Sequence, residues 1–181
     1  MLAASIWVPF LTAGRSARVE QRADEITSLL LEAMQPLGQL DRDVAPVILG
    51  RFHRLALRDH VYVGDLEPLD EPLPGTLLCL VNKHYAFHVA VSPIENDAVR
   101  ATADEPSYEA LAWPLSNVGP GHGVFFYPDD APRAYTRNLS AGYHGLGQRR
   151  PQPGRCHRRD LTVADTGSGY RSQGDERWIL Y

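Results

Sequence analysis

Short apolar runs separated by turn-forming residues dominate positions 76–140. β-branched and aromatic residues fill the runs, and Gly, Pro, Asn and Asp lie between them, which is typical of consecutive antiparallel strands. The pattern predicts four main strands, at Tyr85–Val91, Tyr108–Trp113, Gly123–Tyr127 and Arg133–Thr136.

Two turns in this region indicate how the strands connect. Asn82 and Lys83 separate an apolar run that begins at Thr76 from the first main strand, which predicts a tight hairpin. The four residues Asp129 to Pro132 separate the last two strands, and Asp and Pro both favour turns. The apolar residues that follow Arg177 predict a further, closing strand.

The N-terminal part has a different period. Apolar residues recur at helical spacing through Thr12–Met34, with charged residues on the other face, and Pro36 and Gly38 end the pattern, so we expect an amphipathic helix. An apolar run, Leu2–Leu11, precedes it and is interrupted by Pro9. It is shorter than the about 20 apolar residues that span a bilayer.

The remaining segments carry weaker signals. Val44–Leu57 predicts a second short helix, and Val61–Val63 a short strand. An acidic, proline-interrupted stretch up to Pro74 is interpreted as a surface connection. The Gly-, Pro- and Arg-rich segment after Ala141 is interpreted as a solvated, partly flexible tail.

Together these elements predict an α+β fold, in which a long N-terminal amphipathic helix packs on an antiparallel sheet of about four strands. The predicted organisation is an N-terminal helix at 1–38, an irregular and helical connection at 39–75, the sheet at 76–140 and a C-terminal segment at 141–181 with the closing strand.

Composition restricts the function. The chain has 181 residues, 44% of them hydrophobic and 22% charged, with a formal net charge of −4, so a globular protein without a nucleic-acid partner is expected. Cys79 and Cys156 are too few for a disulfide framework. A single bridge between them is one alternative, and the other is a buried thiol, since Cys79 lies in an apolar run.

Three motifs suggest chemistry. Asp165-Thr-Gly-Ser resembles the aspartic protease signature, but only a short stretch follows it, so a hydrolase using Asp165 is the weakest alternative. His84 and His88 would lie about 13 Å apart on a strand, too far for one zinc ion. Asp129 and Asp130 lack the spacing of a calcium loop. We therefore expect no catalytic, cofactor-binding or metal site, and no enzymatic activity.

The order of the elements resembles the type IV pilins and type II secretion pseudopilins. The matching pieces are Leu2–Leu11 with Thr12–Met34 for the helix, and the four main strands for the sheet. The leader and processing junction typical of that family do not appear in the printed sequence. We expect that Met1 lies inside the apolar half of the family's helix, or that the chain is a relative without an anchor.

The resemblance implies a structural subunit of a pilus or a pseudopilus. Its partners would be other pilin-like or secretion-system subunits, with inner-membrane contact through the N-terminal apolar run. The implied localisation of a full-length chain is the bacterial inner membrane, periplasm or cell surface, and the chain as given is expected to be soluble. The implied assembly interface is a stripe on the helix, formed by Ile6, Trp7, Phe10, Leu11, Val19 and Ile26. A binding module that uses the sheet face or the His84 and His122 loops remains an alternative.

Overall fold

The computed structural model describes residues 4–35, 44–92, 107–158, 169–174 and 176–181, and of residues 4–12 it describes the backbone. The helices are α1 (Ala4–Met34) and α2 (Val44–Arg58). The strands are β1 (Glu67–Pro68), β2 (Leu78–Val81), β3 (Tyr85–Val91), β4 (Tyr108–Pro114), β5 (Val124–Pro128), β6 (Ala134–Thr136), β7 (Gly169–Arg171) and β8 (Arg177–Leu180).

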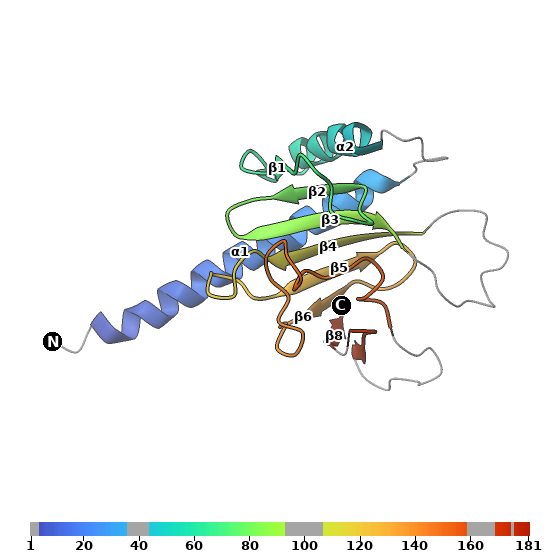
Figure 1. The fold of residues 1–181 in the computed structure, drawn as a ribbon. Helices are drawn as coiled ribbons and strands as arrows, with labels where there is room; N and C mark the ends of the chain where they lie inside the picture. Colours follow the sequence, from blue (N-terminus) through green and yellow to red (C-terminus); the bar gives the residue numbers. More distant parts are fainter. Residues whose placement is uncertain (1–3, 36–43, 93–106, 159–168, 175) are drawn as a thin grey trace.

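One antiparallel sheet contains all of these strands, in the order β1-β2-β3-β4-β5-β6-β8-β7 (Figure 1). The longest ladder joins β3 to β4, from Tyr85 opposite Pro114 to Val91 opposite Tyr108. At the β2–β3 turn, the Asn82 side chain accepts hydrogen bonds from the backbone N–H groups of His84 and Tyr85, both at 2.8 Å. Asn stabilises turns in this way, and the predicted hairpin is confirmed.

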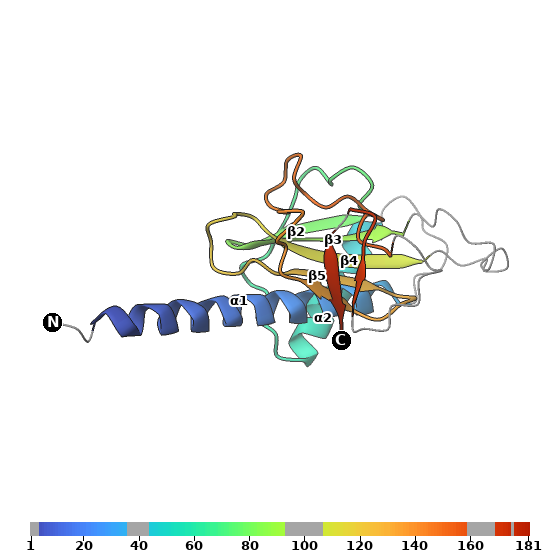
Figure 2. The same ribbon diagram turned by 90° about the horizontal axis from the view of Figure 1, so that it is seen from below.

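Both faces of the sheet are covered, so the protein has two cores (Figure 2). Alternate residues of a strand point to opposite faces. On one face Phe87 and Ala110 pack against α1 and α2. On the other face Leu111 and Trp113 pack with Cys156 and with residues of β7 and β8. This double burial explains why every residue of β4 is buried.

The predicted fold class is wrong. The structure has two helices and an eight-stranded antiparallel sheet, rather than one long helix on about four strands. The strands that were not predicted, β1 and β7, are only two and three residues long, and such short pieces are too brief to show a period of two. They form because neighbouring strands supply hydrogen-bond partners.

Other predictions had mixed outcomes. The second helix is confirmed as α2, and the closing strand as β8. The strand at Val61–Val63 is wrong, because those residues have no regular structure. The solvated-tail interpretation is wrong for residues 141–158, which bury Cys156 against the sheet. Figure 2 shows this segment on the face of the sheet opposite the helices.

No helix in the described part of the chain is both long enough and apolar enough to cross a membrane. The predicted membrane contact would involve the first residues of α1, of which the structure describes the backbone alone.

Candidate functional site

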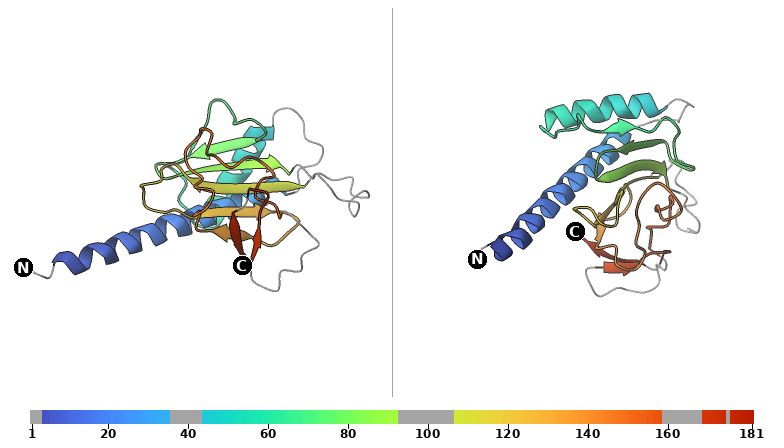
Figure 3. Two further views of the ribbon diagram at one scale, coloured as in Figure 1. Left: turned by 60° about the horizontal axis from the view of Figure 1, so that its bottom comes forward. Right: turned by 60° about the vertical axis from the view of Figure 1, so that its left-hand side comes forward.

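The first half of α1 extends beyond the rest of the molecule, whereas its second half lies against the sheet (Figures 1 and 3). In the projecting half, Ala13, Gly14, Arg15, Ala17 and Arg18 are exposed. No heavy atom lies within 4 Å of the position that a Gly14 Cβ would occupy. This helix presents a surface that the described residues of its own chain do not cover.

The second half of α1 is fixed by an apolar face. Ile26, Leu30, Ala33 and Met34 are buried there against the sheet and α2. Each fully buried side chain of this size contributes about 1.5–3 kcal/mol. This burial fixes the second half to the body of the protein.

One polar flank of α1 binds the β4–β5 loop. The backbone N–H of Gly121 donates to Ser16 Oγ at 3.0 Å. The N–H groups of His122 and Gly123 donate to Glu20 Oε1 at 2.8 and 3.1 Å. Ser16 and Glu20 are four residues apart, and that spacing places them on one side of a helix.

The same flank reaches the C-terminus through Asp24, four residues after Glu20. Asp24 Oδ1 accepts hydrogen bonds from the hydroxyls of Tyr127 and Tyr181, the latter at 2.5 Å. Burial and the bond to Asp24 raise the pKa of both phenols. Both tyrosines therefore stay protonated and donate.

The opposite flank of α1 binds the loop after α2. The Arg22 guanidinium donates to the Tyr62 carbonyl oxygen at 2.8 and 3.1 Å and pairs with the Asp65 carboxylate. The hydrogen bond from Arg22 lowers the pKa of Asp65. With an apolar face and two bonded flanks, α1 cannot rotate relative to the sheet without breaking contacts on both sides.

The predicted interface residues divide between the two halves of α1. Ile6, Trp7, Phe10 and Leu11 lie in the projecting half, and their side chains are outside the described residues. Val19 is half-buried against the core. Ile26 is fully buried in the core of its own chain, so its side chain cannot contact a neighbouring subunit.

A buried polar cluster lies on the other face of the sheet. The Glu109 side chain is 1% exposed, and its carboxylate accepts from the N–H of Gly154 at 3.0 and 3.2 Å. His157 Nε2 lies 2.8 Å from Glu109 Oε2, and His88 Nε2 lies 3.7 Å from Oε1. Burial raises the pKa of Glu109, but the two histidines outweigh that effect and lower it to about 2.

This cluster lacks the geometry of a hydrolytic triad. His157 Nε2 is 2.8 Å from both Ser92 Oγ and Glu109 Oε2. A triad uses one imidazole nitrogen for the nucleophile and the other for the acid, whereas here one nitrogen faces both groups. Ser92 is also buried. The contacts of Glu109 instead hold the Gly154–His157 stretch on the sheet.

The sequence candidates for chemistry do not come together. His84 lies at the β2–β3 turn, and its carbonyl oxygen accepts a hydrogen bond from the Leu115 N–H at 2.8 Å. His88 is buried in the cluster with Glu109. Asp129 accepts from Ser107 Oγ and Tyr108 N–H, which fastens its turn to the start of β4. Asp165 lies outside the described residues. Within the described ranges no group of three metal-ligating side chains is present.

Cys79 and Cys156 are free thiols on the same face of the sheet. Burial raises the pKa of Cys79 to about 12, and that of Cys156 is also raised by burial. The alternative of a disulfide between them is wrong, and both thiols pack as small apolar groups.

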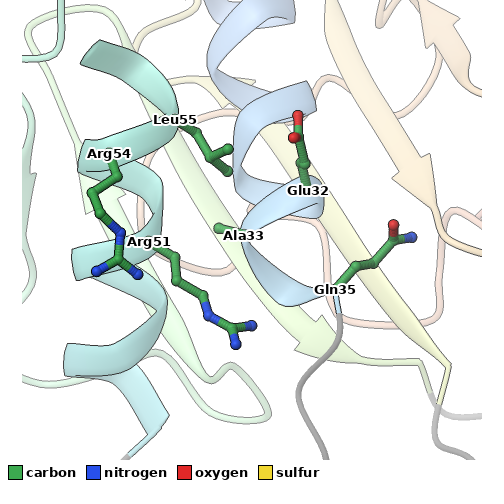
Figure 4. Close-up of a pocket in the computed structure, with 6 residues that line it drawn as sticks. All are labelled: Glu32, Ala33, Gln35, Arg51, Arg54 and Leu55. Carbon is green, nitrogen blue, oxygen red and sulfur yellow. The ribbon is translucent and has the colours of Figure 1, made fainter. Parts of the chain in front are cut away.

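Two hollows border α1. A small one of about 180 Å³ lies between α1 and α2 and is lined by Glu32, Ala33, Gln35, Arg51, Arg54 and Leu55 (Figure 4). It is smaller than the about 300–1,000 Å³ usual for ligand pockets. An open groove of about 460 Å³ runs beside α1. Its lining combines carboxylates, aromatic rings and an aliphatic side chain: Glu20, Gln21, Asp24, Phe125, Tyr135, Ile179 and Tyr181.

The contacts of Ser16, Glu20 and Asp24 were not predicted from the sequence, because polar and charged residues on a helix are usually solvated. Their four-residue spacing was the available signal. No protein-family model matches the chain, and no curated protein or solved structure matches it either.

Proposed function

We propose that this protein is a non-enzymatic structural subunit of a pilus or of an assembly like the type II secretion pseudopilus. The observation that carries the proposal is the projecting half of α1, which continues from a half that is bound to the body on three sides. Its partners are other pilin-like or secretion-system subunits. The N-terminal apolar run contacts the inner membrane, and the body faces the periplasm or the cell surface.

The projecting half of α1 contains four large apolar residues, Ile6, Trp7, Phe10 and Leu11. A group of apolar residues on a helix that leaves the body forms a docking surface or an aggregation hazard wherever its side chains are exposed. Burial of each such side chain between subunits contributes about 1.5–3 kcal/mol. The clamped second half fixes the direction of this helix relative to the body, so assembled subunits would all hold their bodies in the same orientation.

The buried cluster around Glu109 supports a structural role for the body. Its polar groups bind one another and the backbone of Gly154, so they stabilise the fold instead of facing a solvent-accessible cleft. The covalent chemistry of a hydrolase would require an exposed nucleophile beside a base.

The test is self-association of the full chain, measured by sedimentation velocity. Ile6→Asp combined with Phe10→Asp should abolish the large species and leave the melting temperature unchanged, because these residues precede the packed half of α1. The matched control is Val118→Asp with Leu139→Asp, which also replaces two apolar residues, 88% and 83% exposed on loops of the body. Equal assembly by both double variants would overturn the proposal.

A further inference from the structure

Three arginines of α1 lie on one flank, where Glu25 also lies, and the carboxylates of Glu20 and Asp24 lie on the opposite flank. At about 100° per residue, Arg15, Arg18 and Arg22 fall within about 60° of one another, and Glu20 and Asp24 fall about 150–170° from their centre. The contacts agree with this separation, since Arg22 binds the loop after α2 and Glu20 binds the β4–β5 loop. The helix therefore has a basic flank and an acidic flank.

The acidic flank borders the open groove. Glu20 and Asp24 line one wall, and Phe125, Tyr135 and Tyr181 contribute aromatic rings. The hydrogen-bond donors to the two carboxylates are backbone N–H groups and tyrosine hydroxyls. Among the described residues neither carboxylate forms an ion pair, so both charges remain to attract a cation. Carboxylates beside aromatic rings suit a guanidinium group.

The basic flank provides such groups. Arg22 is used within its own chain, by Asp65 and Tyr62. Arg15 and Arg18 are exposed in the projecting half. The two cations Arg15 and Arg18 thus equal the two carboxylates of the groove in number and are opposite to them in charge.

We infer that the groove beside α1 binds the projecting half of α1 from a second copy of this chain, with Arg15 and Arg18 of one copy facing Glu20 and Asp24 of the next. This inference rests on the proposed function and names its contact. Glu20 is five positions after Arg15, and Asp24 is six positions after Arg18. At about 1.5 Å per residue, one parallel stagger of roughly 8 Å satisfies both pairs.

The opposite position of the flanks determines the symmetry. Two copies related by a two-fold axis contact each other through the same surface, so Arg15 and Arg18 would have to share one face with Glu20 and Asp24. Here each copy uses its basic flank on one side and its acidic flank on the other. In such a head-to-tail contact, each added copy leaves one flank free for the next copy. The contact therefore generates a ring if the rotation between copies closes, and an open filament if it does not.

The test uses complementation between two full-length variants in sedimentation velocity at low ionic strength. Variant one carries Arg15→Glu and Arg18→Glu, which blocks the basic flank. Variant two carries Glu20→Gln and Asp24→Asn, which removes the acidic charges and keeps oxygen acceptors for Gly123 and Tyr127. We expect self-association to weaken about 100-fold in variant one, where like charges meet, and about tenfold in variant two.

A mixture of the two variants should form heterodimers and nothing larger, because each variant retains one intact flank. A purely structural defect would not give this rescue. The control Arg54→Glu with Arg149→Glu makes the same charge change on exposed side chains outside α1 and should assemble as the wild type does.

The outcomes separate the two proposals. If the wild type and variants one and two all assembled equally well, this contact would be overturned and the proposed function would stand. Wild-type chain that stays monomeric would overturn both. Variants that lose assembly without rescue in the mixture would overturn the head-to-tail arrangement.

Discussion

The carboxylate of Glu109 gives a quantitative test of how the C-terminal segment is held on the sheet. The perturbation is Glu109→Gln, which keeps an oxygen acceptor for Gly154 N–H and removes the charge that His157 faces. The pKa of Glu109 is lowered from 4.5 to about 2 in the folded protein. At about 1.4 kcal/mol per pKa unit, this difference corresponds to about 3 kcal/mol of stability.

The sign follows from linkage. A carboxyl whose pKa is lower in the folded state stabilises the protein fully above the unfolded value of 4.5, and that contribution is lost as the pH falls from 4.5 towards about 2. The wild type should therefore lose about 3 kcal/mol more than Glu109→Gln across this interval. Other acidic groups titrate in both proteins and cancel in the comparison.

The assay is urea unfolding followed by tryptophan fluorescence, from neutral pH to about pH 2.5. Trp113 and Trp178 are fully buried, so unfolding changes their signal. The control is Glu67→Gln, which removes an exposed carboxyl from β1 and should follow the wild type at every pH. If the free energy of unfolding changed with pH in the same way in the wild type and in Glu109→Gln, the charge of Glu109 would not stabilise the protein, and the reasoning would be refuted.

Two further predictions concern the same face of the sheet. Gly169→Ala would place a Cβ 2.3 Å from the Trp178 carbonyl oxygen and should destabilise the protein by about 1–3 kcal/mol in urea unfolding; Gly147→Ala, with no atom within 4 Å, is the control and should have little effect. Cys79 and Cys156 should resist iodoacetamide in the folded protein, because burial raises their pKa, and both should be alkylated in urea. Rapid alkylation of the folded chain would contradict the burial of these thiols.

The sequence predicted the elements that have long, regular periods. The α1 periodicity and the strands β3, β4 and β5 were visible because each spans at least five residues. The number of strands could not be predicted, since β1 and β7 are too short to show alternation. The almost uninterrupted apolar run of β4 was the available signal for a second covering layer, because a strand without a polar face is covered on both sides.

The site was only half predictable for a related reason. The apolar side chains of the projecting half follow from composition, but the roles of Glu20 and Asp24 depend on a loop and a C-terminus distant in sequence. Ile26 was assigned to the interface because the resemblance to pilins implies an apolar stripe on this helix. The period identifies a buried face, and it does not say whether the burial is within one chain or between two.

The length of α1 connects the fold to the proposed assembly. An isolated helix shorter than about 12–15 residues is marginal in water, because nucleation is costly and each added residue contributes little. In this protein the second half of α1 is held by Ile26, Arg22 and Asp24, so it supplies the nucleus, and the projecting half propagates from it. Among the described residues of the projecting half, Ser16 is hydrogen-bonded to the body and the exposed residues around it are not buried, so a neighbouring subunit would contribute the burial that an isolated helix lacks. The residues that fix the second half to the sheet thus also preorganise the surface proposed to bind the next copy.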